Sequence, residues 1–300
     1  MNRLLTYVIP ILLLLLFHPL PSDAFQNAGP AGRHDKAGIV SPPYSFAVVP
    51  FYSPEKIWLL YSPFVEYLAK ITGKPWELKL FHDHDEFIDA ICNDRVTVGL
   101  AGPVPLSRAY EKCGAKPFLV ALGKNGLPLY HSVLLTNDLT LKRVQDLQGK
   151  RIGFFKGSTA AHILPARMLK EGGLRMSAIQ PIFLDSQDRI MTALFSGEIV
   201  AAGVKEALYQ KFAKEPLRVL KISEPLPNFA LCLTNGFPPA LRQRLAKALL
   251  SLKPLTNQRD AEIVKGWDDE IKNGFMTPDK HYMPAVLKLH RIFEDVEDVR

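Results

Sequence analysis

The chain has 300 residues, a length typical of one large domain or two modest ones. Apolar residues make up 47% of it and charged residues 22%, close to the soluble globular average, which excludes a disordered or collagen-like chain. The 37 Lys and Arg residues exceed the 30 Asp and Glu residues, so the net charge is +7. Three cysteines are too few for a disulfide scaffold or a four-thiolate zinc site, and a single long apolar run excludes a multi-span membrane protein.

Residues 1–24 have the pattern of a secretory signal peptide. A basic residue is followed by an almost unbroken apolar run at 4–17, and Ser22 and Ala24 fit the small positions before a signal peptidase cut. The run is short for a bilayer span and is interrupted by a proline, which argues against an uncleaved anchor. We therefore expect a mature protein that begins near Phe25 and is periplasmic or otherwise secreted.

Export changes which partners and which cysteine chemistry are expected. We expect no nucleic acid, and an anionic ligand or surface fits the basic balance better, although the scattered charges favour an ordinary solvated surface. In an oxidising compartment Cys92 and Cys113 can pair, which would stabilise the fold by roughly 3 kcal/mol if the geometry allows it. Cys232 lies in an apolar segment and is predicted to be a buried, inert thiol.

The first part of the mature chain alternates strands with helices. Residues 25–43 are rich in Gly and Pro and are predicted to be a flexible leader. Ser53 is predicted to cap a helix with apolar residues at helical spacing, and Gly73 to end that helix. We expect further elements as strands at 44–49, 76–81 and 96–101 and a helix at 86–93.

The same alternation continues to the C-terminus. Strands are expected at 118–122, 129–135, 151–155, 181–184, 199–203, 218–222 and 229–233. Helices are expected at 141–147, from 157 to about 171, at 186–196, at 206–213 and from Pro239 onward, with breaks near 254 and 273–274. Strands separated by helices predict an α/β fold with mostly parallel sheets covered on both faces.

The segment around Ser158 is the most informative about chemistry. A predicted strand runs into Gly157-Ser158-Thr159, which opens a helix whose free N–H groups and dipole favour an anion. Two hydroxyls can add hydrogen bonds to a phosphate-like or carboxylate group. The alternative is an ordinary Ser or Thr cap without a ligand, which is the commoner use of this local pattern. A P-loop does not fit, because no G-K-[ST] follows Gly157.

Motifs from residue 44 to about 285 occur in a characteristic order. The first helix contributes 53–56, Pro63, 67–68 and Gly73, and the strand end after it contributes 98–103. The middle of the chain contributes Tyr130 with Ser132, 146–147 with 149–150, and the helix start 158–159 with 164–165. The turn at 195–198 and the return segment at 225–227 complete the order. In this order and spacing they resemble the periplasmic substrate-binding proteins of phosphate/phosphite/phosphonate ABC importers. The resemblance implies a type II periplasmic-binding-protein fold, in which two lobes close on a ligand in the cleft between them. Lobe one would comprise 44–130 and 230–300, and lobe two 131–229.

The resemblance also implies the ligand-binding positions. Ser158 and Thr159 match the family's hydroxyl-rich helix start, and Ala160 stands at the third position of that start. In the first lobe, His84 and Ala101 fall at two positions that are aromatic in the family. In the second lobe, Gln187 falls at a family histidine, and Glu206 corresponds to an acidic residue in the segment that follows. The expected ligand-binding residues are Ser158, Thr159, Ala160, His84, Ala101, Gln187 and Glu206.

Two other polar clusters have the composition of possible sites. His82 and His84, with their acidic neighbours, could bind a divalent metal, but a polar turn before a helix, capped by Asp85, is the preferred interpretation. The acidic run 268–270 is interpreted as a solvated helical face. We therefore expect no metal and no cofactor, and since neither G-x-S-x-G nor H-E-x-x-H occurs, we expect no enzyme.

The function that follows is that of an extracytoplasmic solute-binding protein. It would capture a small anionic solute, such as phosphate, phosphite or a phosphonate, and hand it to an ABC permease, acting as a monomer. The alternative is a sensory or accessory protein that signals ligand occupancy to a membrane sensor. An enzyme acting on a small phosphorylated molecule is a weaker third hypothesis.

Overall fold

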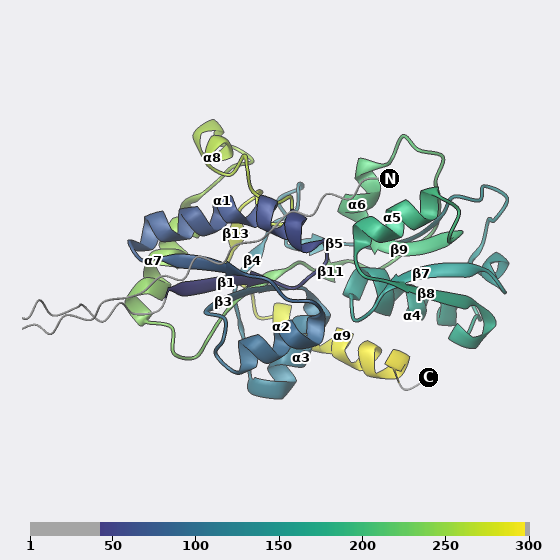
Figure 1. The fold of residues 1–300 in the computed structure, drawn as a ribbon, viewed down its shortest axis with the longest axis horizontal. Coiled ribbons are helices and arrows are strands. Elements are labelled where there is room, and N and C mark those ends of the chain that lie inside the picture. The colour runs from purple at the N-terminus through teal and green to yellow at the C-terminus, as the bar shows by residue number, and fades with distance from the viewer. Residues whose placement is uncertain (1–42, 298–300) are drawn as a thin grey trace, which may run out of the picture. The chain divides into compact units, whose positions relative to one another are not determined.

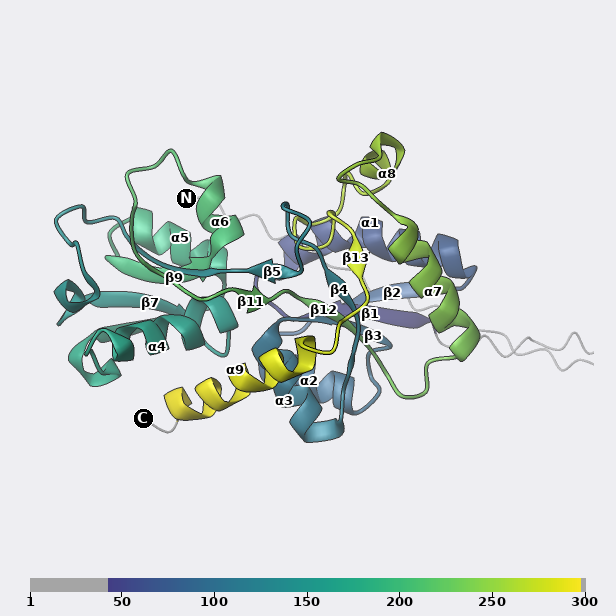
Figure 2. The ribbon, with the colours of Figure 1, turned by 180° about the vertical axis from the view of Figure 1, so that it is seen from behind.

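The computed structural model of the protein describes residues 43–297. The expected signal peptide and all of the expected leader but its last residue lie outside this range, as do residues 298–300. The described residues form two main sheets with helices on both sides of each, and a two-stranded ladder between them (Figures 1 and 2). None of the helices in this range combines the length and hydropathy needed to cross a bilayer.

The first sheet has six strands in the order β13-β4-β12-β3-β1-β2. Helix α1 covers one face of this sheet, and helices α2 and α3 lie on the other (Figure 1). The strands are β1 (Tyr44–Val48), β2 (Trp76–Lys79), β3 (Val98–Ala101), β4 (Pro117–Ala121), β12 (Ala230–Leu233) and β13 (Phe275–Met276). The helices of this lobe are α1 (Pro54–Thr72), α2 (His84–Cys92), α3 (Pro103–Cys113), α7 (Pro239–Ser251) and α8 (Gln258–Ile263).

The second sheet has five strands in the order β10-β6-β9-β7-β8. Helices α5 and α6 lie on one side of it and α4 on the other (Figure 1). The strands are β6 (Ser132–Thr136), β7 (Arg151–Phe155), β8 (Gln180–Leu184), β9 (Ala201–Lys205) and β10 (Arg218–Ile222). The helices are η1 (Val144–Leu147), η2 (Thr159–Ile163), α4 (Leu164–Glu171), η3 (Met176–Ala178), α5 (Gln187–Phe195) and α6 (Glu206–Lys211).

Two features connect the lobes. Strand β5 (Leu129–Tyr130) pairs antiparallel with β11 (Leu226–Pro227) where the chain passes between the two sheets. Helix α9 (Tyr282–Glu297) packs against α3 of the first lobe and against α4 of the second. The two-lobe α/β fold expected from the sequence is therefore confirmed.

Helix α1 shows how local sequence produces this architecture. Ser53 accepts a hydrogen bond from the Lys56 amide at 3.4 Å, and Gly73, at a φ of 66°, ends the helix in the left-handed region. The buried face of the helix brings Phe64 against Phe46 of β1, with the ring centroids 5.0 Å apart. Burying an aromatic side chain of this kind contributes about 1.5–3 kcal/mol, so core packing rather than capping holds the helix on the sheet.

The prediction of mostly parallel sheets is wrong in detail, because both sheets are mixed. Parallel pairing joins β1 to β2 and β3, and β7 to β8 and β9. Strand β12 returns from the second lobe and enters the first sheet antiparallel to both β3 and β4. Strand β6 likewise lies antiparallel to β9 and β10. A strand that enters a sheet from the other lobe is not a local feature, so alternation along the chain does not reveal its direction.

Three local predictions also need correction. Helix α3 was not predicted, although Gly102 at its N-cap and Pro103 in its first turn are ordinary helix-start residues. Helix α2 begins at His84, and its N-cap is Asp83, which accepts from the Glu86 amide at 2.8 Å; Asp85 is not the cap. The expected strand 129–135 is broken at His131 into β5 and β6.

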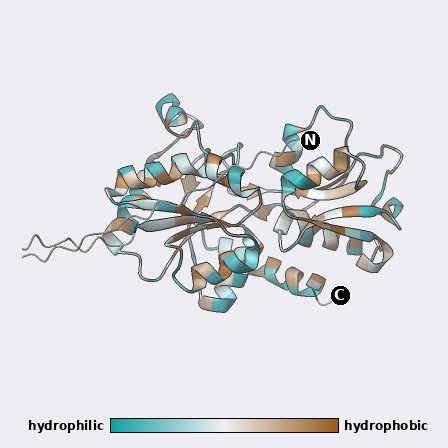
Figure 3. Cartoon of the chain, viewed as in Figure 1, coloured by the Kyte–Doolittle hydropathy of each residue, from teal (hydrophilic) through white to brown (hydrophobic). Residues whose placement is uncertain are grey.

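The cysteines lie where helices α2 and α3 end. A disulfide joins Cys92 to Cys113, whose Cα atoms are 5.5 Å apart, within the range that such a bond requires. Cys232 is a free, buried thiol on β12, and burial raises its pKa to about 12. Apolar residues concentrate on the strands and on the helix faces that turn toward them (Figure 3).

Candidate functional site

The helix start after β7 is built from local backbone geometry. Gly157 has a φ of 77°, a conformation that other residues rarely adopt, and it turns the chain from the strand into the helix. Ser158 is the N-cap, and its Oγ accepts a hydrogen bond from the Ala161 amide at 3.2 Å. One π-helical turn, η2, leads directly into α4, so the helical run extends from Thr159 to Glu171.

This helix start presents hydrogen-bond donors that the protein itself does not use. Within residues 43–297, no hydrogen bond takes the amides of Thr159 and Ala160, as expected for the first turn of a helix. The Tyr130 hydroxyl is buried beside them, close to the Thr159 side chain, and it forms no well-aligned hydrogen bond in the described part of the chain. A buried hydroxyl without a well-aligned hydrogen bond is costly, so its presence next to free amides indicates a polar ligand.

His84 approaches the same place from the first lobe. Its ring is buried, and its Nδ1 lies 3.0 Å from the carbonyl oxygen of Lys156 in the second lobe. Because a carbonyl only accepts, Nδ1 carries the proton and donates. Burial lowers the pKa of His84 to about 4, so the ring is neutral at ordinary pH and its Nε2 is an acceptor.

A small cavity lies between these groups. Its volume is about 20 Å³, little more than one water molecule needs. Five of the seven residues predicted to bind ligand line it, and they come from both lobes. They are His84, Ser158, Thr159, Ala160 and Gln187.

The other two predicted residues do not line this cavity. Ala101 is fully buried at the end of β3, where it pairs with Ala230 of β12. Glu206 begins α6 and lines a neighbouring cavity instead. Lys205, the residue directly before Glu206, lines both cavities, as Tyr130 does.

Lys205 is the main site residue that sequence reasoning missed. It is 6% exposed, its Nζ donates to Asn228 Oδ1 at 2.9 Å, and it forms an ion pair with Glu270 of the first lobe. Its Nζ also lies 4.2 Å from the ring centroid of Tyr130 and 4.4 Å from that of Phe229. The one available signal was a charged residue at the end of an otherwise apolar strand, Ala201–Lys205.

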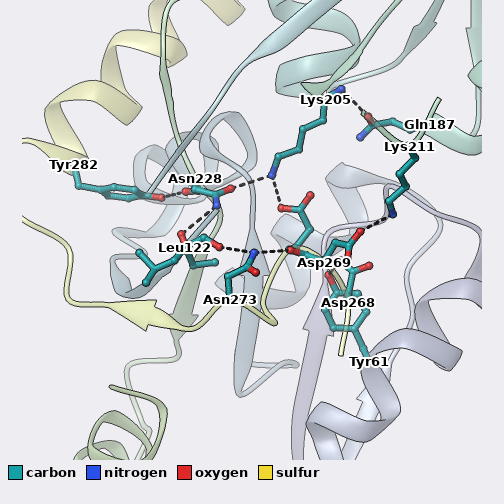
Figure 4. Close-up of polar contacts among 12 residues, drawn as sticks. Tyr61, Leu122, Gln187, Lys205, Lys211, Asn228, Asp268, Asp269, Asn273 and Tyr282 are labelled. Carbon is teal, nitrogen blue, oxygen red and sulfur yellow. Dashed lines mark hydrogen bonds and ion pairs between the residues drawn. The ribbon is translucent and has the colours of Figure 1, made fainter. Parts of the chain in front are cut away.

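The prediction that 268–270 is a solvated face is also wrong. Asp268 and Glu270 are buried, and Tyr61 donates to Asp268 Oδ1 at 3.0 Å (Figure 4). Burial and the nearby Glu270 carboxylate raise the pKa of Asp268 above its ordinary value. Partial burial acts in the same direction on Asp269, but its bonds to Lys272 and Lys211 outweigh burial and lower its pKa to about 2. The segment 268–270 therefore packs between the lobes, a position that its charge alone did not predict.

Several polar contacts hold the two lobes together around the cavity. The Val104 amide at the start of α3 donates to Thr159 Oγ1 at 3.0 Å, which supplies the side-chain cap that Gly102 lacks. The Gln187 amide donates to the Phe51 carbonyl at 3.2 Å. These contacts cross from one lobe to the other at residues that line the cavity or adjoin it.

Metal ligation finds no support in the described residues. Among them, no group of three or more His, Cys, Asp or Glu side chains is arranged to hold a metal ion. His82 lies before α2, where its amide donates to the Glu86 carboxylate at 2.9 Å, while His84 faces the second lobe.

Two α/β lobes with a cavity between them are the architecture of type II periplasmic binding proteins. Residues 46–282 match the family described as "ABC transporter, phosphonate, periplasmic substrate-binding protein". The chain therefore belongs to that family, as the motif order predicted, and it is a binding protein rather than an enzyme. Over 137 residues it is 28% identical to a putative aliphatic sulfonates-binding protein of Escherichia coli (strain K12), a match covering 45% of this chain and 42% of that relative's length.

Solved structures share the fold at low sequence identity. PhnD1 from Prochlorococcus marinus (MIT 9301), in complex with methylphosphonate, has a TM-score of 0.72 and 12% identity, covering 84% of this chain and 98% of that one. A binding protein component of a phosphonate ABC transporter from Pseudomonas aeruginosa has a TM-score of 0.69 and 15% identity, covering 86% and 96%. The alkanesulfonate-binding protein SsuA from Xanthomonas axonopodis pv. citri, bound to MOPS, has a TM-score of 0.61 and 18% identity, covering 86% and 94%.

Proposed function

We propose that this protein binds a compact tetrahedral oxyanion, of the phosphonate or phosphate class, between its lobes. The observation that carries the proposal is the set of unused donors at the helix start. The amides of Thr159 and Ala160 and the hydroxyls of Ser158 and Tyr130 gather at one cavity. Helix starts bind such anions through N–H groups and the helix dipole, without a fixed positive side chain.

His84 supplies a reason for preferring phosphonates over sulfonates. A neutral ring with its proton on Nδ1 can only accept at Nε2, so it favours a ligand oxygen that carries a proton. A phosphonate has such a proton near neutral pH, whereas a sulfonate does not. The expected lobes, 44–130 with 230–300 and 131–229, would close on the ligand about β5 and β11.

The physiological role that follows is delivery to a membrane permease. We propose that the protein is periplasmic after cleavage near Ala24, and that the closed, loaded form hands its anion to an ABC importer. Family membership supports this role. In cells that lack the protein, uptake of the anion should be lost, and the wild-type chain should restore it while the double variant Ser158→Ala, Tyr130→Phe should not.

Calorimetric titration of the mature protein tests the binding proposal. Methylphosphonate, phosphate and phosphite should bind at least tenfold more tightly than methanesulfonate and sulfate. Ser158→Ala and Tyr130→Phe should each weaken binding by about 10–100-fold, because each removes a hydrogen bond to a charged group. Tyr67→Phe, which removes a hydroxyl from a half-buried ring packed on Trp267, should bind like wild type. Equal binding of methylphosphonate and methanesulfonate would refute the role given to His84, and no binding of any of these anions would refute the function.

A further inference from the structure

The surroundings of the Lys205 ammonium are those of a binding site for an organic cation. Two aromatic rings, Tyr130 and Phe229, lie within 4.4 Å of Nζ, a carboxylate from Glu270 pairs with it, and the Asn228 amide oxygen accepts from it. Aromatic faces combined with a carboxylate are how proteins recognise ammonium groups. Figure 4 shows the side chain reaching from the second lobe to Asn228. We call these four residues, Tyr130, Phe229, Asn228 and Glu270, the cation cage. In this protein the cage is occupied by the Lys205 side chain of the protein itself.

The same side chain separates two cavities. The cavity at the helix start measures about 20 Å³, and a second one, of about 140 Å³, lies on the other side of Lys205 and Tyr130, which line both. The second cavity is lined by carboxylates, including Glu206, Asp269 and Glu270. Without the Lys205 side chain, an anion at the helix start could extend an amino group toward these carboxylates.

Displacement of Lys205 by a ligand is strongly unfavourable. The ion pair with Glu270 is buried on both sides, at 7% and 8% side-chain exposure. Removing one partner leaves an uncompensated buried charge, which is among the costliest changes in a protein interior. A ligand ammonium that took the place of the Lys205 ammonium would pair with Glu270 but would leave the lysine charge without its partner, so Lys205 resists displacement.

We propose that Lys205 determines specificity by occupying the cation cage itself, so that the site takes compact oxyanions without a cationic group and rejects those that carry an amino group. The proposal rests on the proposed function for the anion, but the cage can be tested without any anion.

The first test uses alkylammonium ions alone. Lys205→Ala should show a saturating rise in melting temperature of about 2–4 °C in ethylammonium chloride relative to sodium chloride, as a bound ligand produces in a protein of this size. Wild type should show none. Lys211→Ala, which removes another lysine of the same region by breaking its 2.9 Å ion pair with Asp269, should behave as wild type. If Lys205→Ala is folded by circular dichroism and does not respond, the cage does not exist as described.

The second test uses a pair of anions that differ only by an amino group. Wild type should bind ethylphosphonate at least tenfold more tightly than 2-aminoethylphosphonate, and Lys205→Ala should reverse this preference. Lys205→Met, which fills similar space without charge, should bind 2-aminoethylphosphonate no better than wild type does. Equal affinity of wild type for both anions would overturn the proposal, and this arm still decides it if Lys205→Ala fails to fold. If neither anion binds wild type, the proposed function fails, whereas the ethylammonium response still decides whether the cage exists.

Discussion

At the scale of single residues, His84 and the acidic run show how burial sets charge. His84 donates from Nδ1 across the cleft and is kept neutral by burial, so it links the lobes without adding charge to the cavity. Asp268 and Asp269 are neighbours in sequence, yet their pKa values shift in opposite directions, because one is enclosed beside Glu270 and the other pairs with two lysines. Each case leads to a prediction about pH.

The stability of the protein should depend on pH through His84. Its folded pKa of about 4 lies below the unfolded value of about 6.5, so its neutral form is favoured in the fold. The contribution is fully present above about pH 6.5 and is lost as the pH falls toward 4, by up to about 3 kcal/mol. Urea unfolding between about pH 7.5 and pH 4.5 should therefore show a smaller loss for His84→Gln than for wild type.

Other groups also titrate in this range, so the difference between the two proteins is the quantity to compare. His281→Gln, at an exposed histidine, should follow the wild-type curve. Parallel curves for wild type and His84→Gln would contradict the account of His84.

Asp268→Asn should stabilise the protein at neutral pH. The raised pKa means that ionised Asp268 costs free energy in the fold, and an amide oxygen can still accept from Tyr61 and from the Glu270 amide. The gain should be of the order of 1–2 kcal/mol at about pH 7 and should fade as the pH drops below about 4, where the carboxyl is protonated in both states. Chemical denaturation at the two pH values measures it.

Asp269→Asn is the matched control, with the opposite sign expected. The lowered pKa means that ionised Asp269 favours the fold, so this substitution should destabilise the protein near pH 7. If both substitutions destabilise it equally, the carboxylate of Asp268 is not penalised by burial.

At the scale of elements, helix starts and ends carry most of the functional geometry. The start at Thr159 offers free amides, and the hydroxyl of Thr159 caps α3 from across the cleft. The capping residues that can be recognised in the sequence were sufficient to locate helix α1 and the start of the helix that follows β7. They did not locate α3, because its only side-chain cap comes from the other lobe, 55 residues away.

The disulfide between the ends of α2 and α3 should stabilise the fold substantially. It closes a loop with a sequence separation of 21, which corresponds to roughly 3 kcal/mol on the chain-entropy model. The double variant Cys92→Ala, Cys113→Ala should lose about that much in urea unfolding. A reducing agent should lower the stability of wild type and leave the double variant unchanged.

Cys232 provides an internal check on that experiment. Burial and a pKa of about 12 should keep its thiol unreactive toward a thiol reagent until the protein unfolds. If the unreduced native protein reacts rapidly with the reagent through Cys92 or Cys113, the disulfide is absent in solution.

At the scale of the whole molecule, ion pairs between the lobes should favour closure. Lys56 of α1 pairs with Asp188 of α5 at 2.8 Å, and its Nζ lies 3.8 Å from the Tyr52 ring centroid. Both side chains are about one third exposed, so the pair contributes little, less than about 1 kcal/mol. Lys56→Ala should therefore weaken methylphosphonate binding by about two- to fivefold.

Salt and a control lysine separate this effect from a general loss of charge. The difference between Lys56→Ala and wild type should shrink in about 1 M salt, where exposed charges are screened. Lys265→Ala breaks an exposed pair within one lobe and should leave affinity unchanged. A Lys56→Ala variant that binds like wild type at low salt would show that this pair does not bias closure.

Local chemistry determined much about this protein from sequence alone. Apolar periodicity and the residues that cap and end helices predicted the alternation of strands and helices, and hydroxyls after a strand predicted the helix start that lines the cavity. The two-lobe arrangement followed from the motif order through its resemblance to a family. His84 and Gln187 followed from resemblance, and both line the same cavity. These features depend on residues close together in the chain or on a motif order retained in the family.

Only the tertiary structure decided which charges are buried and what they face. Lys205 and Glu270 are 65 residues apart, and only the packing of the two lobes brings them together. The same packing buried Asp268, set the proton of His84 on Nδ1 and turned β12 antiparallel to its neighbours. The free energy of a charge or of a strand edge depends on the groups that pack against it and exclude water. In a two-lobe protein those groups come from distant parts of the chain.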